Sequence, residues 1–243
     1  MNKPLVLRLN PALDEGRLAR TYLEHGIVQI ANIFEPETAE YLTQILEQHT
    51  PWGMAYQDAG GPKALTADQL KSADHDQLRQ ALKAMLDRTG DGYGFLYRCY
   101  PMLTAYLERR DPGHPIHALT EFLTSPAFIE FGARVTGQPQ VVKADSQATY
   151  YRPGDFIGLH TDVGSEPSNR LTAYTLGFTR RWREDWGGQL LFHDENGDIQ
   201  RGYAPRWNTL TLFRVPQPHS VAPVAGYAKA PRLSIVGWLR DKG

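Results

Sequence analysis

The stretch that decides the interpretation of the chain is residues 150–162, which read YYRPGDFIGLHTD. A Pro-Gly turn is followed by a short apolar run and then by the pair His160 and Asp162. Side chains alternate across a β-strand, so residues two positions apart project from the same face. If the apolar run is a strand, an imidazole and a carboxylate lie side by side, as two neighbouring ligands of a metal site require.

A third ligand is expected from His219, because it also follows a strand-like run, residues 209–215. Two histidines and one carboxylate on one face of an iron(II) ion leave three positions open for other ligands, and manganese or nickel can occupy the same three side chains. His193-Asp194 runs directly into a turn at residues 195–198, so we expect a hairpin there. The remaining histidines lie in helical or loop sequence with no partner at ligand spacing: His25, His49, His75, His114 and His117.

A candidate anion site follows at Arg232 and Ser234, which share one face of a predicted strand. A guanidinium and a hydroxyl pointing into a barrel suit the capture of a carboxylate through two hydrogen bonds. The alternative is an edge-strand arginine in a surface ion pair.

Composition restricts the class of protein. The 243 residues carry 26 basic and 27 acidic side chains, and this balance favours neither nucleic acid nor an anionic membrane surface as a partner. Cys99 is the single cysteine, which suits a reducing compartment. The apolar run near the N-terminus is too short for a signal peptide, and no run reaches membrane-spanning length. We therefore expect a soluble cytoplasmic protein, and nothing indicates its oligomeric state.

The pattern of elements predicts a mainly β protein of the α+β class, formed as a single domain over residues 1–243. Helical periodicity dominates residues 1–136, whereas strands dominate 137–243. The sequence predicts an antiparallel barrel or jelly roll, with the helices packed on the outside of one of its sheets. Residues 52–66 are rich in glycine and predict a loop. Short strands are expected at 93–97, 140–152, 156–160, 171–178, 189–193, 209–215 and 233–239.

The order His160-x-Asp162, His219, Arg232-x-Ser234 resembles the Fe(II)- and 2-oxoglutarate-dependent dioxygenases, and most closely their prolyl hydroxylase-like group. Residues 151–154, which read YRPG, and the strand start at 187–190, GGQL, add to the resemblance. It implies a double-stranded β-helix, which is a form of jelly roll, with iron held by His160, Asp162 and His219. It further implies that Arg232 binds the distal carboxylate of the co-substrate 2-oxoglutarate. It also implies O2 as the second co-substrate and a supporting role for ascorbate.

The resemblance further implies a tyrosine that binds the distal carboxylate, on the strand after the His-x-Asp turn. Tyr174 lies about two residues earlier than in the relatives, so Ser234 and Tyr151 are alternative ligands. At the rim of the site we expect Tyr97 and Arg98, from an aromatic-rich segment, and Trp182, from the loop at 180–186. Core packing is the alternative for the aromatic segment, and a solvated loop is the alternative for 180–186.

These features predict hydroxylation of a C–H bond, with a prolyl residue of a protein as the first substrate hypothesis. A free amino acid or a small metabolite is the alternative substrate. A non-catalytic, metal-binding jelly-roll module is the alternative from another class of protein.

Overall fold

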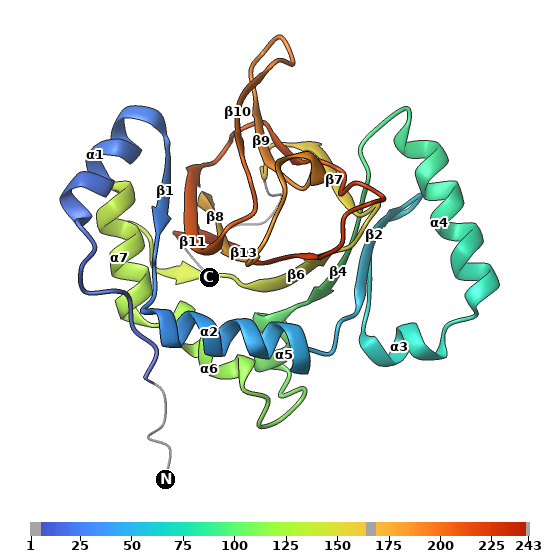
Figure 1. The fold of residues 1–243 in the computed structure, drawn as a ribbon, viewed down its shortest axis with the longest axis horizontal. Coiled ribbons are helices and arrows are strands. Elements are labelled where there is room, and N and C mark those ends of the chain that lie inside the picture. Colours follow the sequence, from blue (N-terminus) through green and yellow to red (C-terminus); the bar gives the residue numbers. More distant parts are fainter. Residues whose placement is uncertain (1–5, 164–168, 242–243) are drawn as a thin grey trace.

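The computed structural model describes residues 6–163 and 169–241. Its centre is a strongly curled antiparallel sheet, in which the chain folds back on itself to form a half-barrel (Figure 1). One half of the sheet consists of β1 (Ile27–Ala31), β11 (Trp207–Arg214), β8 (Arg170–Phe178), β13 (Arg232–Arg240) and β6 (Gln147–Tyr151), in that order. The short strand β5 (Lys143–Ala144) pairs with the end of β13. We call this the major half.

The other half, the minor half, consists of β7 (Phe156–His160), β12 (His219–Val221), β9 (Leu190–His193) and β10 (Ile199–Tyr203). The two halves are joined by β4 (Phe95–Tyr100), which pairs with β6 through its second part and with β7 through its first. The short helix η2 (Glu184–Trp186) lies between β8 and β9. The expected jelly-roll architecture of the α+β class is thus confirmed, and so is the hairpin after His193.

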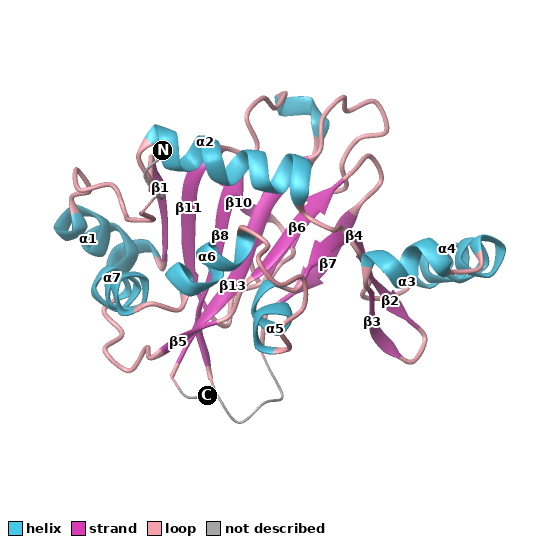
Figure 2. Ribbon diagram, turned by 90° about the horizontal axis from the view of Figure 1, so that it is seen from below, coloured by secondary structure: helices cyan, strands magenta, loops and turns pink. Residues whose placement is uncertain are grey.

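Helices cover the outer face of the major half (Figure 2). They are α1 (Glu15–His25), α2 (Pro36–Gln44) with its continuation η1 (Ile45–His49), α5 (Met102–Leu107), α6 (Ile116–Leu123) and α7 (Pro126–Thr136). Capping side chains and glycine residues help to set where these helices begin and end. In α1, for example, the side chain of Asp14 accepts a hydrogen bond from the N–H of Arg17, and Gly26 ends the helix at φ 68°.

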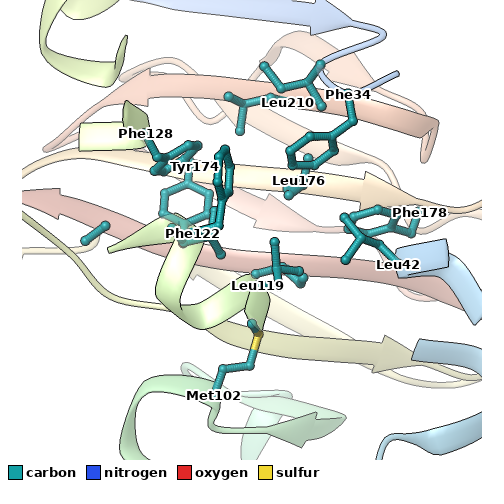
Figure 3. Packing of buried hydrophobic residues seen from close by; sticks show 14 of the residues in the cluster. Phe34, Leu42, Met102, Leu119, Phe122, Phe128, Tyr174, Leu176, Phe178 and Leu210 are labelled. Carbon is teal, nitrogen blue, oxygen red and sulfur yellow. The ribbon is translucent and has the colours of Figure 1, made fainter. Parts of the chain in front are cut away.

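Between these helices and the sheet lies the main hydrophobic core, shown from close by in Figure 3. Alternation along β8 supplies one side of it, because Tyr174, Leu176 and Phe178 point to the helices and are almost fully buried. The intervening residues, such as Ala173, point into the half-barrel. Burying a side chain of this size stabilises the folded state by roughly 1.5–3 kcal/mol. The buried layer therefore fixes which face of each strand packs against the helices, and the opposite face is left for the site.

The prediction of a loop at residues 52–66 is wrong. These residues form a hairpin of β2 (Met54–Asp58) and β3 (Gly61–Leu65), followed by α3 (Ala67–Ser72) and α4 (His75–Thr89) (Figure 1). Gly61, at φ 117°, permits the tight turn, and Met54 is buried against Met85 of α4 in a small separate core. We call residues 54–89 the accessory unit; β2 attaches it to β4.

None of the helices within residues 6–163 and 169–241 combines the length and the apolar character needed to cross a membrane.

Candidate metal and co-substrate site

The structure brings the three predicted metal ligands together at the mouth of the half-barrel. His160 ends β7, His219 begins β12, and the pairing of these strands sets the two residues opposite one another. Their ring centres are 4.1 Å apart. Nε2 of His160 lies 3.3 Å from Oδ1 of Asp162, and Nε2 of His219 lies 3.4 Å from Oδ2. The three ligand atoms fall within 4.8 Å of one another, which is close enough for one ion to contact all of them.

Backbone contacts fix the orientation of both imidazoles. Nδ1 of His160 donates to the carbonyl of Gly158 at 2.9 Å, and Nδ1 of His219 donates to the carbonyl of Gln217 at 2.7 Å. A carbonyl can only accept, so each Nδ1 carries the proton and each Nε2 presents its lone pair to the site. Asp162 reaches the same point from a left-handed backbone conformation, φ 62°, which aspartate tolerates better than most residues.

The charges of the triad suit a divalent cation. Burial, reinforced by the neighbouring His160, lowers the pKa of His219 to about 4, so this imidazole is neutral at pH 7. Burial acts to raise the pKa of Asp162, but the neighbouring His160 and His219 lower it below its usual value. Two imidazoles and one carboxylate on one face are the ligand set of non-haem iron(II) oxygenases, so the residues fit that ion.

A buried cation lies on the inner face of the major half. Arg232 is 4% exposed; its Nη1 donates to the hydroxyl of Ser234 at 3.1 Å, and its guanidinium lies over the ring of Tyr151 at 4.9 Å. No carboxylate within residues 6–163 and 169–241 forms an ion pair with it. Burial lowers the pKa of Arg232, but a guanidinium keeps its proton at neutral pH. A buried charge without a counter-charge is costly, so the position fits an anionic ligand such as the distal carboxylate of 2-oxoglutarate.

Arg232 and Ser234 line a pocket to which several other polar side chains contribute. The sequence did not single out Gln29, Thr175, Thr179 and Thr211, which belong to its lining. A carboxylate prefers hydrogen-bond donors to an apolar wall, so the hydroxyls of Thr175 and Thr211 add to the fit, whereas that of Thr179 already donates to the carbonyl of Leu233.

Tyr174 does not contact this pocket, and its assignment as a co-substrate ligand is corrected. It pairs with Gly237 on the helix-covered face of the sheet, where its ring meets Phe128 edge-on at 5.6 Å. Its hydroxyl donates to the carbonyl of Asp145 at 2.7 Å. Arg232 is on the opposite face, because it lies an odd number of residues from Gly237 along the strand.

Two of the residues expected at the rim of the site, Tyr97 and Arg98, lie on opposite faces of the sheet. Tyr97 points into the half-barrel and stacks on Tyr151 at 5.1 Å. Arg98, the next residue of β4, pairs with Tyr150 and therefore points to the outer face, so the prediction that it lines the rim is wrong. Trp182 and Arg232 both approach Gly188, and the indole N–H of Trp182 donates to the carbonyl of Gly187 at 2.9 Å. Trp182 therefore lies near Arg232 without lining the carboxylate pocket, and its place at the rim stays a prediction.

Arg170 and Trp238 also border the metal ligands, and sequence reasoning missed both. The guanidinium of Arg170 lies 3.8 Å from the centre of the Trp238 ring, and its Nη1 donates to the backbone carbonyl of Asp162 at 3.3 Å. The periodicity that selected Arg232 and Ser234 continues to Trp238, so the sequence contained a signal for that residue. Arg170 had no such signal, since its contact with Asp162 depends on how the chain returns to the sheet.

Residues 146–240 match the family model of the 2OG-Fe(II) oxygenase superfamily. The matched segment contains all three metal ligands together with Arg232 and Ser234. Residues 146–240 therefore form a 2OG-Fe(II) oxygenase domain, and the resemblance seen in the motifs is confirmed. Proteins of this superfamily use iron(II), 2-oxoglutarate and O2.

Among individual proteins, the chain is similar to Prolyl 3-hydroxylase OGFOD1 of Xenopus laevis, with 30% identity over 139 residues. That match covers 54% of this chain but 26% of the relative, so the chain spans about a quarter of that protein's length. A prolyl-4-hydroxylase of Pseudomonas putida has the same fold, with a TM-score of 0.59, 18% identity and coverage of 94% of this chain and 100% of the other.

A prolyl hydroxylase of Trichoplax adhaerens, solved with a hypoxia inducible factor peptide, gives a TM-score of 0.62 at 14% identity. It covers 93% of this chain and 89% of the other. At this level of identity the two solved structures show a shared fold.

Proposed function

We propose that the protein is an iron(II)- and 2-oxoglutarate-dependent hydroxylase whose substrate is a prolyl residue of a protein. The observation that carries the proposal is the buried guanidinium of Arg232, which has no ion-pair partner among the described residues. It lies on the inner face of the barrel whose mouth holds His160, Asp162 and His219. A metal-binding module has no need of a second, anion-specific position beside its metal ligands. The similarity to a prolyl 3-hydroxylase supports the choice of substrate.

Each residue has a role that follows from its surroundings. The two imidazoles and Asp162 would hold the iron. Arg232 and Ser234 would bind the distal carboxylate of 2-oxoglutarate and so orient its keto acid end. Iron and 2-oxoglutarate together supply the oxidation, in which 2-oxoglutarate and O2 become succinate and CO2 while one oxygen atom enters a substrate C–H bond.

The class of reaction is tested by anaerobic titration with iron(II) and 2-oxoglutarate. The complex gives a weak visible charge-transfer band, and we expect His160→Ala and Asp162→Ala to abolish it. His75→Ala is the matched control, because His75 is an exposed residue at the start of α4, and this variant keeps the band. A wild-type protein with no band, and no succinate formed with ascorbate present, would show a non-catalytic module instead.

The substrate is tested by comparing cells with and without the gene. Mass spectrometry of their proteins and metabolites is expected to show a gain of one oxygen on a prolyl residue that depends on the gene. A gain of one oxygen on a free amino acid or another metabolite, with no change in any protein, would reject the prolyl assignment and leave the oxygenase assignment standing.

A further inference from the structure

A continuous row of aromatic rings lines one wall of the half-barrel, beginning beside the metal ligands. The ring of Tyr93 lies 5.8 Å from that of His160 and 5.8 Å from that of Phe95. Phe95 lies 5.6 Å from Tyr97, which stacks on Tyr151 at 5.1 Å. Phe95 and Tyr97 share a face of β4 because they are two residues apart, and the ring contacts place Tyr93, just before the strand, in the same row.

Only the outermost member of this row is open to a large substrate. Tyr93 is 45% exposed, whereas Tyr151 is 3% exposed and lies against the guanidinium of Arg232. The hydroxyl of Tyr97 already accepts a hydrogen bond from Gln147. In the described part of the chain, no residue forms a hydrogen bond with the hydroxyl of Tyr93.

Although exposed, Tyr93 is tied to the metal site through the backbone. The carbonyl of the next residue, Gly94, accepts a hydrogen bond from the N–H of Gly158 at 2.8 Å. The carbonyl of Gly158 in turn accepts from Nδ1 of His160. The position of the Tyr93 ring relative to the metal ligands is therefore set by two consecutive hydrogen bonds, and this preorganisation is what a substrate contact needs.

The side chain offers two kinds of contact. Its ring provides a flat apolar face, against which the CH2 groups of a pyrrolidine ring pack well. Its phenol hydroxyl carries a proton at neutral pH and can donate a hydrogen bond. A prolyl residue has no N–H of its own, and its peptide is recognised through carbonyl oxygens, which need donors.

We propose that Tyr93 is a positioning residue that determines specificity for the substrate, with its ring against the pyrrolidine of the target proline and its hydroxyl donating to a carbonyl oxygen of the peptide. The inference rests on the proposed function, and it adds the residue that makes the site select a prolyl ring. It also gives the accessory unit a connection to the site, since Tyr93 is reached from the end of α4 through Gly90 and Gly92.

The test measures peptide binding without turnover. Protein loaded with manganese(II) and 2-oxoglutarate is titrated with the peptide acetyl-Gly-Ala-Pro-Ala-Gly-amide, and Kd is read from the paramagnetic relaxation of the prolyl protons. We expect Tyr93→Ala to raise Kd by about tenfold or more, and Tyr93→Phe, which keeps the ring, to raise it by about threefold to tenfold. Tyr41→Ala, at a tyrosine of α2 that is 41% exposed on the helical layer, leaves Kd unchanged.

A second readout separates this inference from the proposed function. The charge-transfer band of iron(II) and 2-oxoglutarate is expected to titrate equally in the wild type, Tyr93→Ala and Tyr93→Phe. If the wild type gives the band but does not bind the peptide, or if Tyr93→Ala binds it as tightly as the wild type, the role of Tyr93 is rejected while the oxygenase assignment stands. If the wild type gives no band, the proposed function fails and this inference fails with it.

Discussion

Arg232 and Tyr151 face each other across the pairing of β13 with β6, and the guanidinium carbon lies 4.9 Å from the centre of the phenol ring. The contact holds the cation in place without neutralising it, because a ring face attracts a cation and carries no net charge. Ser234, two residues along, supplies a hydroxyl that is itself 2.8 Å from the hydroxyl of Thr149. The guanidinium is thus positioned in advance for an anion.

Arg232→Ala should therefore separate co-substrate binding from metal binding. Loss of a charge-assisted pair of hydrogen bonds costs about 2–3 kcal/mol, so the Kd for 2-oxoglutarate should rise about 30-fold to 150-fold. The Kd for iron(II) should change by less than about threefold, since all three ligands remain. Both are measured by anaerobic titration, with Arg183→Ala, at an exposed arginine paired with Asp185, as the control. Equal losses of both affinities would refute this division of roles.

Gly158→Ala should weaken the metal site without touching a ligand. A Cβ at this position would lie 3.0 Å from the carbonyl oxygen of Gly94, so one of the two segments has to move. The same residue's carbonyl orients His160, and disturbing such a partner typically lowers metal affinity about tenfold to 100-fold. Competition with a chelator measures the change in iron(II) affinity.

Gly202→Ala is the matched control, because its Cβ would meet the end of the flexible Leu191 side chain in the β9–β10 hairpin. If Gly158→Ala and Gly202→Ala both bind iron(II) as tightly as the wild type, the Gly158 carbonyl does not orient His160.

The parts of the site that could be predicted from sequence are those fixed by short-range spacing. His160 and Asp162 need only the end of one strand, and Arg232 and Ser234 need only the alternation of another. Their convergence depends on long-range pairing. His219 was nevertheless predictable as a candidate, because it follows a strand-like run as His160 does.

The predictions were wrong where the sequence shows that side chains alternate along a strand but does not show which face of the sheet each set occupies. Both faces of β8 are buried, so the pattern of apolar residues does not reveal that Tyr174 points to the helices. Arg98 was misplaced for the same reason, since β4 alternates between the half-barrel and the outer face. The hairpin of β2 and β3 escaped prediction because β2 is held by β4, which lies about 40 residues further along the chain.

Asn208→Ala should be among the most destabilising substitutions outside the site. Asn208 is fully buried at φ 52°; its Oδ1 accepts from the N–H of Phe34 at 3.0 Å, and its Nδ2 donates to the Phe34 carbonyl at 2.8 Å. Alanine leaves both backbone groups without a partner and tolerates the left-handed backbone less well. The free energy of unfolding in urea should fall by about 2–4 kcal/mol. Asn196→Ala, in the exposed turn of the β9–β10 hairpin, should change it by less than about 0.5 kcal/mol.

Cys99 should be inert toward alkylation in the folded protein. It is 2% exposed, and burial raises the pKa of its thiol to about 12, against the opposing charge of Arg98. The reactive thiolate is therefore almost absent at pH 8. Iodoacetamide should modify Cys99 only after the chain is unfolded in guanidinium chloride, as mass spectrometry would detect. Rapid modification of the native protein at pH 8 would contradict the burial of this side chain.

The same thiol should make stability depend on pH in the alkaline range. Because the folded pKa, about 12, is above the usual value of 9.0, the unfolded chain loses the proton first as pH rises. The contribution of Cys99 is therefore fully present below pH 9.0 and is lost toward pH 12, with a slope of about 1.4 kcal/mol per pH unit. Cys99 also acts on the pKa of Tyr97 and Tyr151, but burial holds the pKa of both far above the usual value for tyrosine in the folded protein. Both stay protonated there up to pH 10.5, so over this range the difference in unfolding free energy between wild type and Cys99→Ala reports the thiol. Between pH 9 and 10.5 the unfolding free energy of the wild type should fall relative to that of Cys99→Ala. A constant difference over this range would show that the pKa of the thiol is the same in the folded and unfolded chains.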